Sequence, residues 1–160
     1  MHARSPYVIW QRVVLTLLLF VPTFLSLAAN LQLVSALDSS NDSPASANGD
    51  SYFPIISPDG RYVLFASTAN NLVPTNSGGP VPTVLLHTLN VFLRDRLSGT
   101  NILVSANLAG NGANWNSLPS GISTNGQYAL FESEASDLVS GDMNNANDIF
   151  VRDLDALFFL

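Results

Sequence analysis

The residues best suited to chemistry lie in the loop from Asp142 to Asp148, where carboxylate and amide oxygens recur at short intervals. Asp142, Asn144 and Asp148 fall at positions one, three and seven of this loop, a spacing typical of the oxygen ligands of Ca²⁺. Position six is Asn147 instead of glycine, and no glutamate follows at position twelve. These three residues are therefore a candidate calcium site. The alternative is a turn rich in Asn and Asp whose side chains cap their own backbone.

Trp115 is a second candidate for ligand binding. It lies in a stretch of small and amide residues, GNGANWNS, from Gly110 to Ser117. An exposed indole surrounded by amides can stack on the apolar face of a sugar. The alternative is an indole that fills the contact between neighbouring sheets.

No arrangement typical of an enzyme accompanies these candidates. The chain has no cysteine and no lysine, which excludes thiol catalysis, Cys-type zinc sites and a lysine-bearing phosphate loop. It has no G-x-S-x-G motif, and His87 is the one histidine beyond the first residues. Glu132 and Glu134 are predicted to share one face of a strand. Because they lie at the end of that strand, we expect a solvated edge and not a catalytic pair. We predict a non-enzymatic protein with no catalytic residues and no cofactor, calcium being the one candidate ion.

An Arg-Asp pair occurs twice, as Arg94-Asp95 and as Arg152-Asp153. Neighbours on a strand point to opposite faces, so neither pair can form a single two-residue site. We expect each arginine to form an ion pair across strands or between sheets, and each aspartate to cap a turn.

The composition indicates a folded, acidic chain. Of its 160 residues, 47% are hydrophobic and 11% are charged, unlike a disordered sequence. The formal net charge is −6, and two of the six arginines lie within the first dozen residues. Such a surface repels phosphate groups, so we expect a protein partner and no nucleic acid.

The first 29 residues have the pattern of an export signal. His2, Arg4 and Arg12 form a basic start, and residues 13–29 then carry no charge. This run is slightly short for a spanning helix, and Pro22 would kink one. We predict a cleaved hydrophobic signal helix. A retained N-terminal anchor is the alternative and would be the chain's only membrane contact. The remainder is expected to be exported to the periplasm, the cell surface or the medium.

An internal repeat organises the residues beyond this leader. Residues 56–73 align without gaps on residues 122–139 with ten of eighteen positions identical, where chance predicts about one. A second block, NVFLRD at 90–95, matches DIFVRD at 148–153. The two blocks lie further apart in the first copy, which places a loop insertion at 78–88.

Each copy is predicted to form short antiparallel strands joined by tight turns. Residues 57–60 (SPDG) and 124–126 (TNG) are turn sequences whose glycine adopts positive φ. In the following strand, alternate residues from Tyr62 to Ser67 point to opposite faces, and both faces are largely apolar. Such a sheet has to be covered on both sides. This favours stacked propeller blades over a two-sheet sandwich, whose outer faces would be polar.

The motif ISPDGRYVLFAS, followed by NVFLRDRLSG, resembles the TolB-like, WD-repeat-like propeller repeats of exported bacterial proteins. The resemblance spans both copies, from Leu31 to Leu154. It implies an all-β fold of about two four-stranded antiparallel propeller blades, and a role in protein interaction or scaffolding. It also leaves open an accessory propeller domain severed from a larger hydrolase, or a calcium- or glycan-binding surface module.

The chain thus divides into a leader over 1–29, a first strand and linker over 30–50, one repeat over 51–106 and a second, truncated repeat over 107–160. Two blades cannot close a ring, which needs about four. The chain is then expected to be either a partial propeller or a unit that completes a ring as a homo-oligomer.

Overall fold

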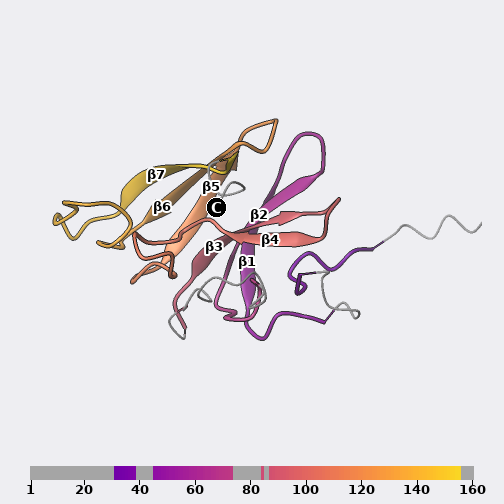
Figure 1. Ribbon diagram of the computed structural model, residues 1–160, viewed down its shortest axis with the longest axis horizontal. Helices are drawn as coiled ribbons and strands as arrows, with labels where there is room; N and C mark the ends of the chain where they lie inside the picture. The colour runs from indigo at the N-terminus through magenta and orange to yellow at the C-terminus, as the bar shows by residue number, and fades with distance from the viewer. Residues whose placement is uncertain (1–30, 39–44, 74–83, 85–86, 156–160) are drawn as a thin grey trace, which may run out of the picture. The chain divides into compact units, whose positions relative to one another are not determined.

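The computed structural model describes residues 31–38, 45–73, 84 and 87–155 (Figure 1). The predicted leader over 1–29, most of the insertion at 78–88 and residues 156–160 lie outside the described residues. The described chain is all-β, with two antiparallel sheets and no α-helix. Within this part of the chain, no helix is long and apolar enough to cross a membrane.

The first sheet is a meander of four strands. β1 (Ser51–Ile56), β2 (Tyr62–Ser67), β3 (Asn90–Asp95) and β4 (Thr100–Leu103) lie side by side in chain order, each antiparallel to the next. β2 and β3 pair over their whole length. A bulge between Tyr52 and Ile55 interrupts the pairing of β1 with β2.

The second sheet follows the same order. β5 (Ser117–Ile122), β6 (Tyr128–Ser133) and β7 (Asp148–Asp153) form an antiparallel meander with a bulge between Pro119 and Gly121. Residues of β5 and β6 lie 66 positions after those of β1 and β2, and residues of β7 lie 58 positions after those of β3. We call residues at these spacings counterparts. The second repeat is predicted to be truncated before its fourth strand, and residues 156–160, which follow β7, lie outside the described residues.

Both hairpins turn where the sequence predicts. Gly60 and Gly126 each have a φ of 73°, in the left-handed region that favours glycine. In the first turn the Ser57 hydroxyl accepts a hydrogen bond from the Tyr62 amide at 2.9 Å, and the bond between their counterparts is also 2.9 Å. The predicted positive φ at both glycines is confirmed, because local turn chemistry alone determines it.

The main core lies between the two sheets. β5 lies against β1, β2 and β3 of the first sheet (Figure 1). Three side chains on that side of the first sheet, Leu64, Val91 and Leu93, are at most 1% exposed. They pack in one cluster with side chains of the second repeat, among them Ala129, Phe131, Ala135, Leu138 and Leu154.

The first sheet is also buried on its other face. Phe65 and Phe92 lie opposite each other on β2 and β3, with ring centroids 6.0 Å apart, and are 2% and 1% exposed. Val34 and Ala47, from the segment that precedes β1, pack against these rings. The prediction that both faces are covered is therefore confirmed for the first sheet.

Candidate functional site

The second sheet has an exposed apolar face on the side away from the first sheet. Tyr128 and Leu130 of β6 and Ile149 and Val151 of β7 lie on this side, and we call these four residues the outer face. Their exposed fractions are 43%, 37%, 75% and 65% respectively. The prediction that both faces are covered is wrong for this sheet, because no described segment stacks on the outer face.

The counterparts of the outer face are buried in the first sheet. Leu64, Val91 and Leu93 hold the same ladder positions as three residues of the outer face. They lie under the second sheet and are 0%, 0% and 1% exposed. Both sets are equally apolar, so the difference in burial comes from the neighbouring sheet that one of them has and the other lacks.

The contact between the sheets includes a tyrosine ring packed on a glycine. A Cβ added to Gly126 would lie 2.2 Å from Cε2 of Tyr62. At the counterpart glycine, Gly60, the nearest atom to such a Cβ is Nη1 of Arg96, at 3.8 Å. The counterpart ring, Tyr128, is 43% exposed. The second tyrosine, Tyr128, and the second glycine, Gly60, therefore do not form such a contact within the chain.

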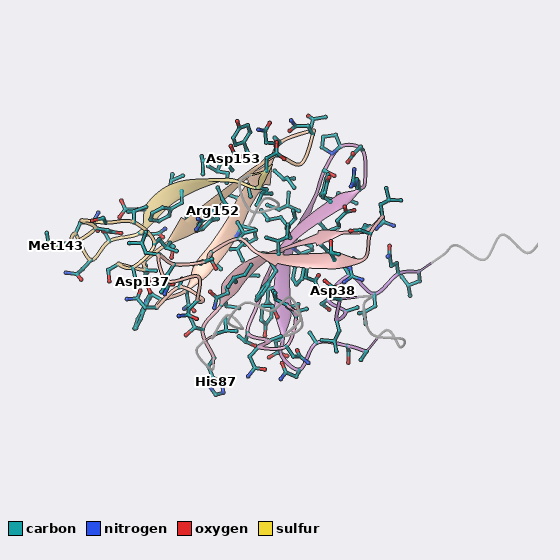
Figure 2. All side chains as sticks on the ribbon, in the orientation of Figure 1. Asp38, His87, Asp137, Met143, Arg152 and Asp153 are labelled. Atoms are coloured by element: carbon teal, nitrogen blue, oxygen red, sulfur yellow. The ribbon has the colours of Figure 1, made fainter. Side chains whose placement is uncertain are left out.

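Two largely buried arginines hold the segments that lead into the two sheets. Arg94 donates to the carbonyl oxygens of Ala36 and Leu37 at 3.3 and 3.0 Å. Arg152, labelled in Figure 2, donates from Nε to the carbonyl oxygen of Val104 at 3.0 Å and from Nη2 to that of Ala106. Burial lowers the pKa of both guanidinium groups. We expected carboxylate partners. These hydrogen bonds go to backbone carbonyl groups, which need a donor when they are buried. The negative charges of Asp38 and Asp95 also act on Arg94 and oppose the effect of burial on its pKa.

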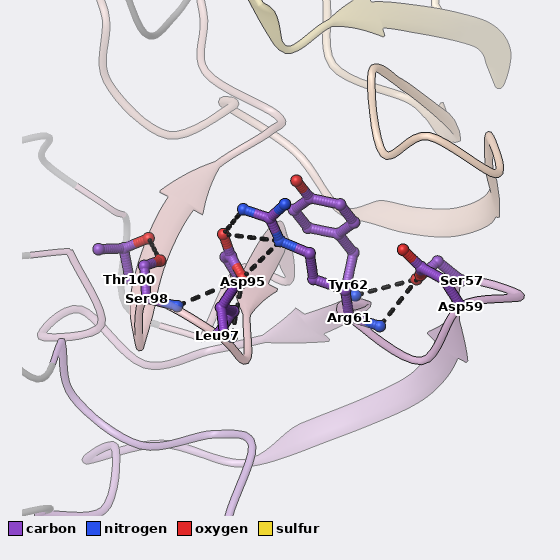
Figure 3. Close-up of polar contacts among 8 residues, drawn as sticks. All are labelled: Ser57, Asp59, Arg61, Tyr62, Asp95, Leu97, Ser98 and Thr100. Atoms are coloured by element: carbon purple, nitrogen blue, oxygen red, sulfur yellow. Dashed lines mark hydrogen bonds and ion pairs between the residues drawn. The ribbon is translucent and has the colours of Figure 1, made fainter.

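Asp95 links the two turns at one end of the first sheet (Figure 3). Its carboxylate forms an ion pair with Nη2 of Arg61 at 2.7 Å and accepts a hydrogen bond from the Leu97 amide at 2.9 Å. Burial alone would raise the pKa of Asp95, but the bonds from Arg61 and Leu97 lower it below its ordinary value. Asp153 accepts from the Asp155 amide at 3.1 Å. The turn caps predicted for both aspartates are confirmed.

The candidate calcium loop is held by its own hydrogen bonds. Asn144 donates from Nδ2 to Oδ2 of Asp148 at 2.7 Å, and its Oδ1 accepts from the Ala146 amide at 2.9 Å. The second bond is the Asx-turn geometry of the alternative interpretation. Two of the three candidate ligands are thus brought together, and within the described residues no hydrogen bond joins Asp142 to them. The described residues contain no group of three or more acidic or histidine side chains that could hold a metal. Calcium binding stays a prediction.

Trp115 lies in a polar hollow and is 56% exposed. The hollow has a volume of about 320 Å³ and is lined by Asn114, Trp115, Glu134, Ser136 and Asn145. Asn114 and Ser136 are joined by two hydrogen bonds of 3.1 Å. The counterpart of Trp115 is Gly49, where a Cβ would lie 2.5 Å from the Ala69 nitrogen. The indole is therefore peculiar to the second repeat, and it does not fill the contact between the two sheets.

Of the other side chains singled out in the sequence, Glu132 and Glu134 line a common hollow, whereas His87 is not among the residues that line it. His87 is exposed and is labelled at the edge of Figure 2. Glu132 accepts a hydrogen bond from Nδ2 of Asn147 at 3.0 Å. Glu134 lines the hollow of Trp115.

In comparisons with protein-family models, curated proteins and solved structures, the chain matches none. The site is therefore interpreted from its own residues. The outer face was not among the candidate sites from the sequence, although the alternation of apolar residues marked its members as one face. The sequence did not indicate that this face is exposed, because exposure depends on whether another sheet stacks on the face and not on the residues of the strand itself.

Proposed function

We propose that the chain is a non-enzymatic protein-interaction or scaffolding module that acts after export and binds through the outer face of the second sheet. The observation that carries the proposal is the difference in burial between counterparts: Val91 is 0% exposed and Ile149 is 75% exposed. Leaving apolar surface in water costs about 25 cal/mol per Å² relative to burial. A contiguous apolar face that stays exposed is typical of a protein-binding surface.

Propeller-type blades are the architecture that we propose for the two sheets. Three features support it: the shared strand order, the shared hairpin geometry and the apolar character of both faces. The side of β2 with Leu64 packs on the side of β6 with Phe131, so the sheets stack front to back. Stacking of this kind can be continued, because each added sheet presents one more face of each type. The resemblance of the turn and strand motifs to TolB-like repeats also favours this architecture.

Site-specific photo-crosslinking of the full chain in its own cells tests the proposed function. A benzophenone amino acid at Val151 should yield a covalent adduct with a protein. The same group at Leu108, which is 71% exposed but lies in a turn outside the outer face, should yield none. The proposal fails if Val151 gives no adduct, or if both positions give the same adducts in the same yield.

A second candidate function is carbohydrate binding at Trp115. The hollow combines an exposed indole with amide, hydroxyl and carboxylate groups, which is a combination suited to stacking and hydrogen bonding with a sugar ring. Because the counterpart of Trp115 is a glycine with no room for a side chain, the hollow is not a repeated element of the sheets.

A further inference from the structure

Within one chain, described residues of the second repeat cover Leu64, Val91 and Leu93. The covering surface is the side of the second sheet that carries Phe131, stacked on Phe150 with centroids 5.4 Å apart. Ile122 at the end of β5 packs against the same cluster, and Val104, which follows β4, belongs to it. An apolar face of this type is therefore covered by a phenylalanine pair, an isoleucine and a valine in a fixed arrangement.

The first sheet presents the counterparts of these groups on its far side. Phe65 and Phe92 correspond to the phenylalanine pair, and Ile56 corresponds to Ile122. Val34 lies in the sequence LVSA at 33–36, which recurs around Val104 at 103–106.

The rim of this far side is open to a neighbour, although Phe65 and Phe92 themselves are buried under Val34 and Ala47. Ile56 is 57% exposed, whereas its counterpart packs against the cluster between the sheets. A hollow of about 320 Å³ is lined by Leu33, Val34, Pro54 and Phe65, among others. We call Leu33, Val34, Pro54, Ile56 and Phe65 the far face.

Tyr128 and Gly60, which do not pack on each other within one chain, fit the same arrangement. Between the sheets of one chain, Tyr62 packs on Gly126. If the outer face of one copy met the far face of another, Tyr128 would meet Gly60, where a Cβ has no neighbour closer than 3.8 Å.

Two charges beside the proposed contact are of opposite sign, although the exposed Asp59 next to Gly60 adds a negative charge. Asp153 lies opposite Tyr128 in the ladder and is exposed. Arg96 is exposed and donates from Nη1 to the Gly60 carbonyl at 2.6 Å, so its positive charge lies beside that glycine. Contact between Tyr128 and Gly60 would therefore bring opposite charges together. Pairing of two outer faces would instead bring carboxylates together, because Glu132 lies on the same face opposite Ile149.

We propose that the partner of the outer face is a second copy of this chain, which binds head to tail through its far face. The inference rests on the proposed function and names the partner of its binding surface. The contact is heterologous, so a bound pair still has one free outer face and one free far face for further copies.

Cysteine crosslinking of the full chain tests this proposal, since the chain has no cysteine of its own. A short bismaleimide should join the double variant Ile56→Cys/Val151→Cys into dimers and larger species. Each single variant should remain uncrosslinked, because a head-to-tail contact places the two positions on different faces. The control double variant is Leu108→Cys/Val151→Cys, which should give no crosslinked species.

Three results would overturn the proposal. A dimer from Val151→Cys alone would mean that outer faces pair with each other. Equal crosslinking of the control would mean unspecific association. A lack of crosslinks in every variant would exclude a second copy as the partner. The proposed function would survive this last result if the photo-crosslinker at Val151 still captured a different protein.

A glycine variant tests the same contact by steric exclusion. Gly60→Asn, in the double-cysteine background, should lower the crosslinked fraction about tenfold by placing a side chain where the Tyr128 ring of the other copy packs. Gly110→Asn is the matched control, since Gly110 has a φ of 78° and open space around it. Asparagine tolerates this backbone conformation at both positions. An equal crosslinked fraction in the two variants would contradict the proposed fit.

Discussion

The packing of Tyr62 on Gly126 gives a prediction that isolates the contact between the two sheets. Gly60 and Gly126 have the same φ, 73°, and hold the same position in the two hairpins. Replacement of either by alanine imposes the same backbone strain, which is about 1–2 kcal/mol for a residue in the left-handed region. Any further difference between the two variants has to come from what the added methyl group meets.

The structure sets the size of that difference. At Gly60 a Cβ lies 3.8 Å from its nearest neighbour, an ordinary contact, so Gly60→Ala should cost the strain alone. At Gly126 a Cβ lies 2.2 and 2.4 Å from two ring atoms of Tyr62, well inside the usual separation of about 3.5–4.0 Å between carbon atoms. The ring has to move, and overpacking of this kind adds about 1–3 kcal/mol. Gly126→Ala should therefore cost about 2–5 kcal/mol of unfolding free energy.

Urea unfolding followed by circular dichroism measures both variants, and a double-mutant cycle identifies the cause. In a Tyr62→Ala background the ring is gone, so Gly126→Ala should cost no more than Gly60→Ala does in the natural sequence. Equal costs for the two glycine variants in the natural sequence would refute the proposed packing. So would an extra cost at Gly126 that persists without the ring.

Three further predictions concern burial, charge and the hollow. Val91→Ala should lower the free energy of unfolding by about 2–3 kcal/mol, and Ile149→Ala by less than about 1 kcal/mol, in urea unfolding at low protein concentration. Ile149→Ala removes more atoms, so the reverse order would contradict the assigned burial. The lowered pKa of Asp95 means that its contribution to stability is present above its unfolded pKa of about 4 and is lost as the pH falls through its folded value. Asp95→Asn should thus be less stable than the natural chain at pH 7 and should lose less further stability on acidification, and parallel curves would show that the ion pair contributes nothing. Trp115→Ala should abolish retention on any glycan that the natural chain binds while changing stability by less than about 0.5 kcal/mol, and undiminished retention would exclude the indole as the stacking residue.

Features encoded by adjacent residues were predictable from the sequence. The SPDG and TNG turns require a residue with positive φ, and glycine supplies it at both positions. The alternation in β2 and the match between the two copies were sufficient to predict antiparallel strands and which residues share a face. The caps at Asp95 and Asp153 follow from the same local chemistry, because the acceptor and the amide that it binds are two residues apart.

Features that depend on distant segments could not be predicted from the sequence. Arg152 bonds carbonyl groups 46 and 48 positions away, and nothing near it in sequence identifies them. Leu64 and Leu130 are identical in type and setting, yet one is 0% and the other 37% exposed. Local sequence defines the apolar face, whereas the sheet stacked on it decides whether that face is core or surface.

The central claim is that the same apolar face is covered in the first sheet and free in the second. The labelling rate of a single introduced cysteine by a maleimide tests it most directly, at protein concentrations low enough for a monomer. We predict that Val151→Cys reacts about as fast as the unfolded chain. Its counterpart Leu93→Cys should react on the order of 10³-fold more slowly, or slower still, because it is reached only by unfolding. Similar rates at the two positions would contradict the account.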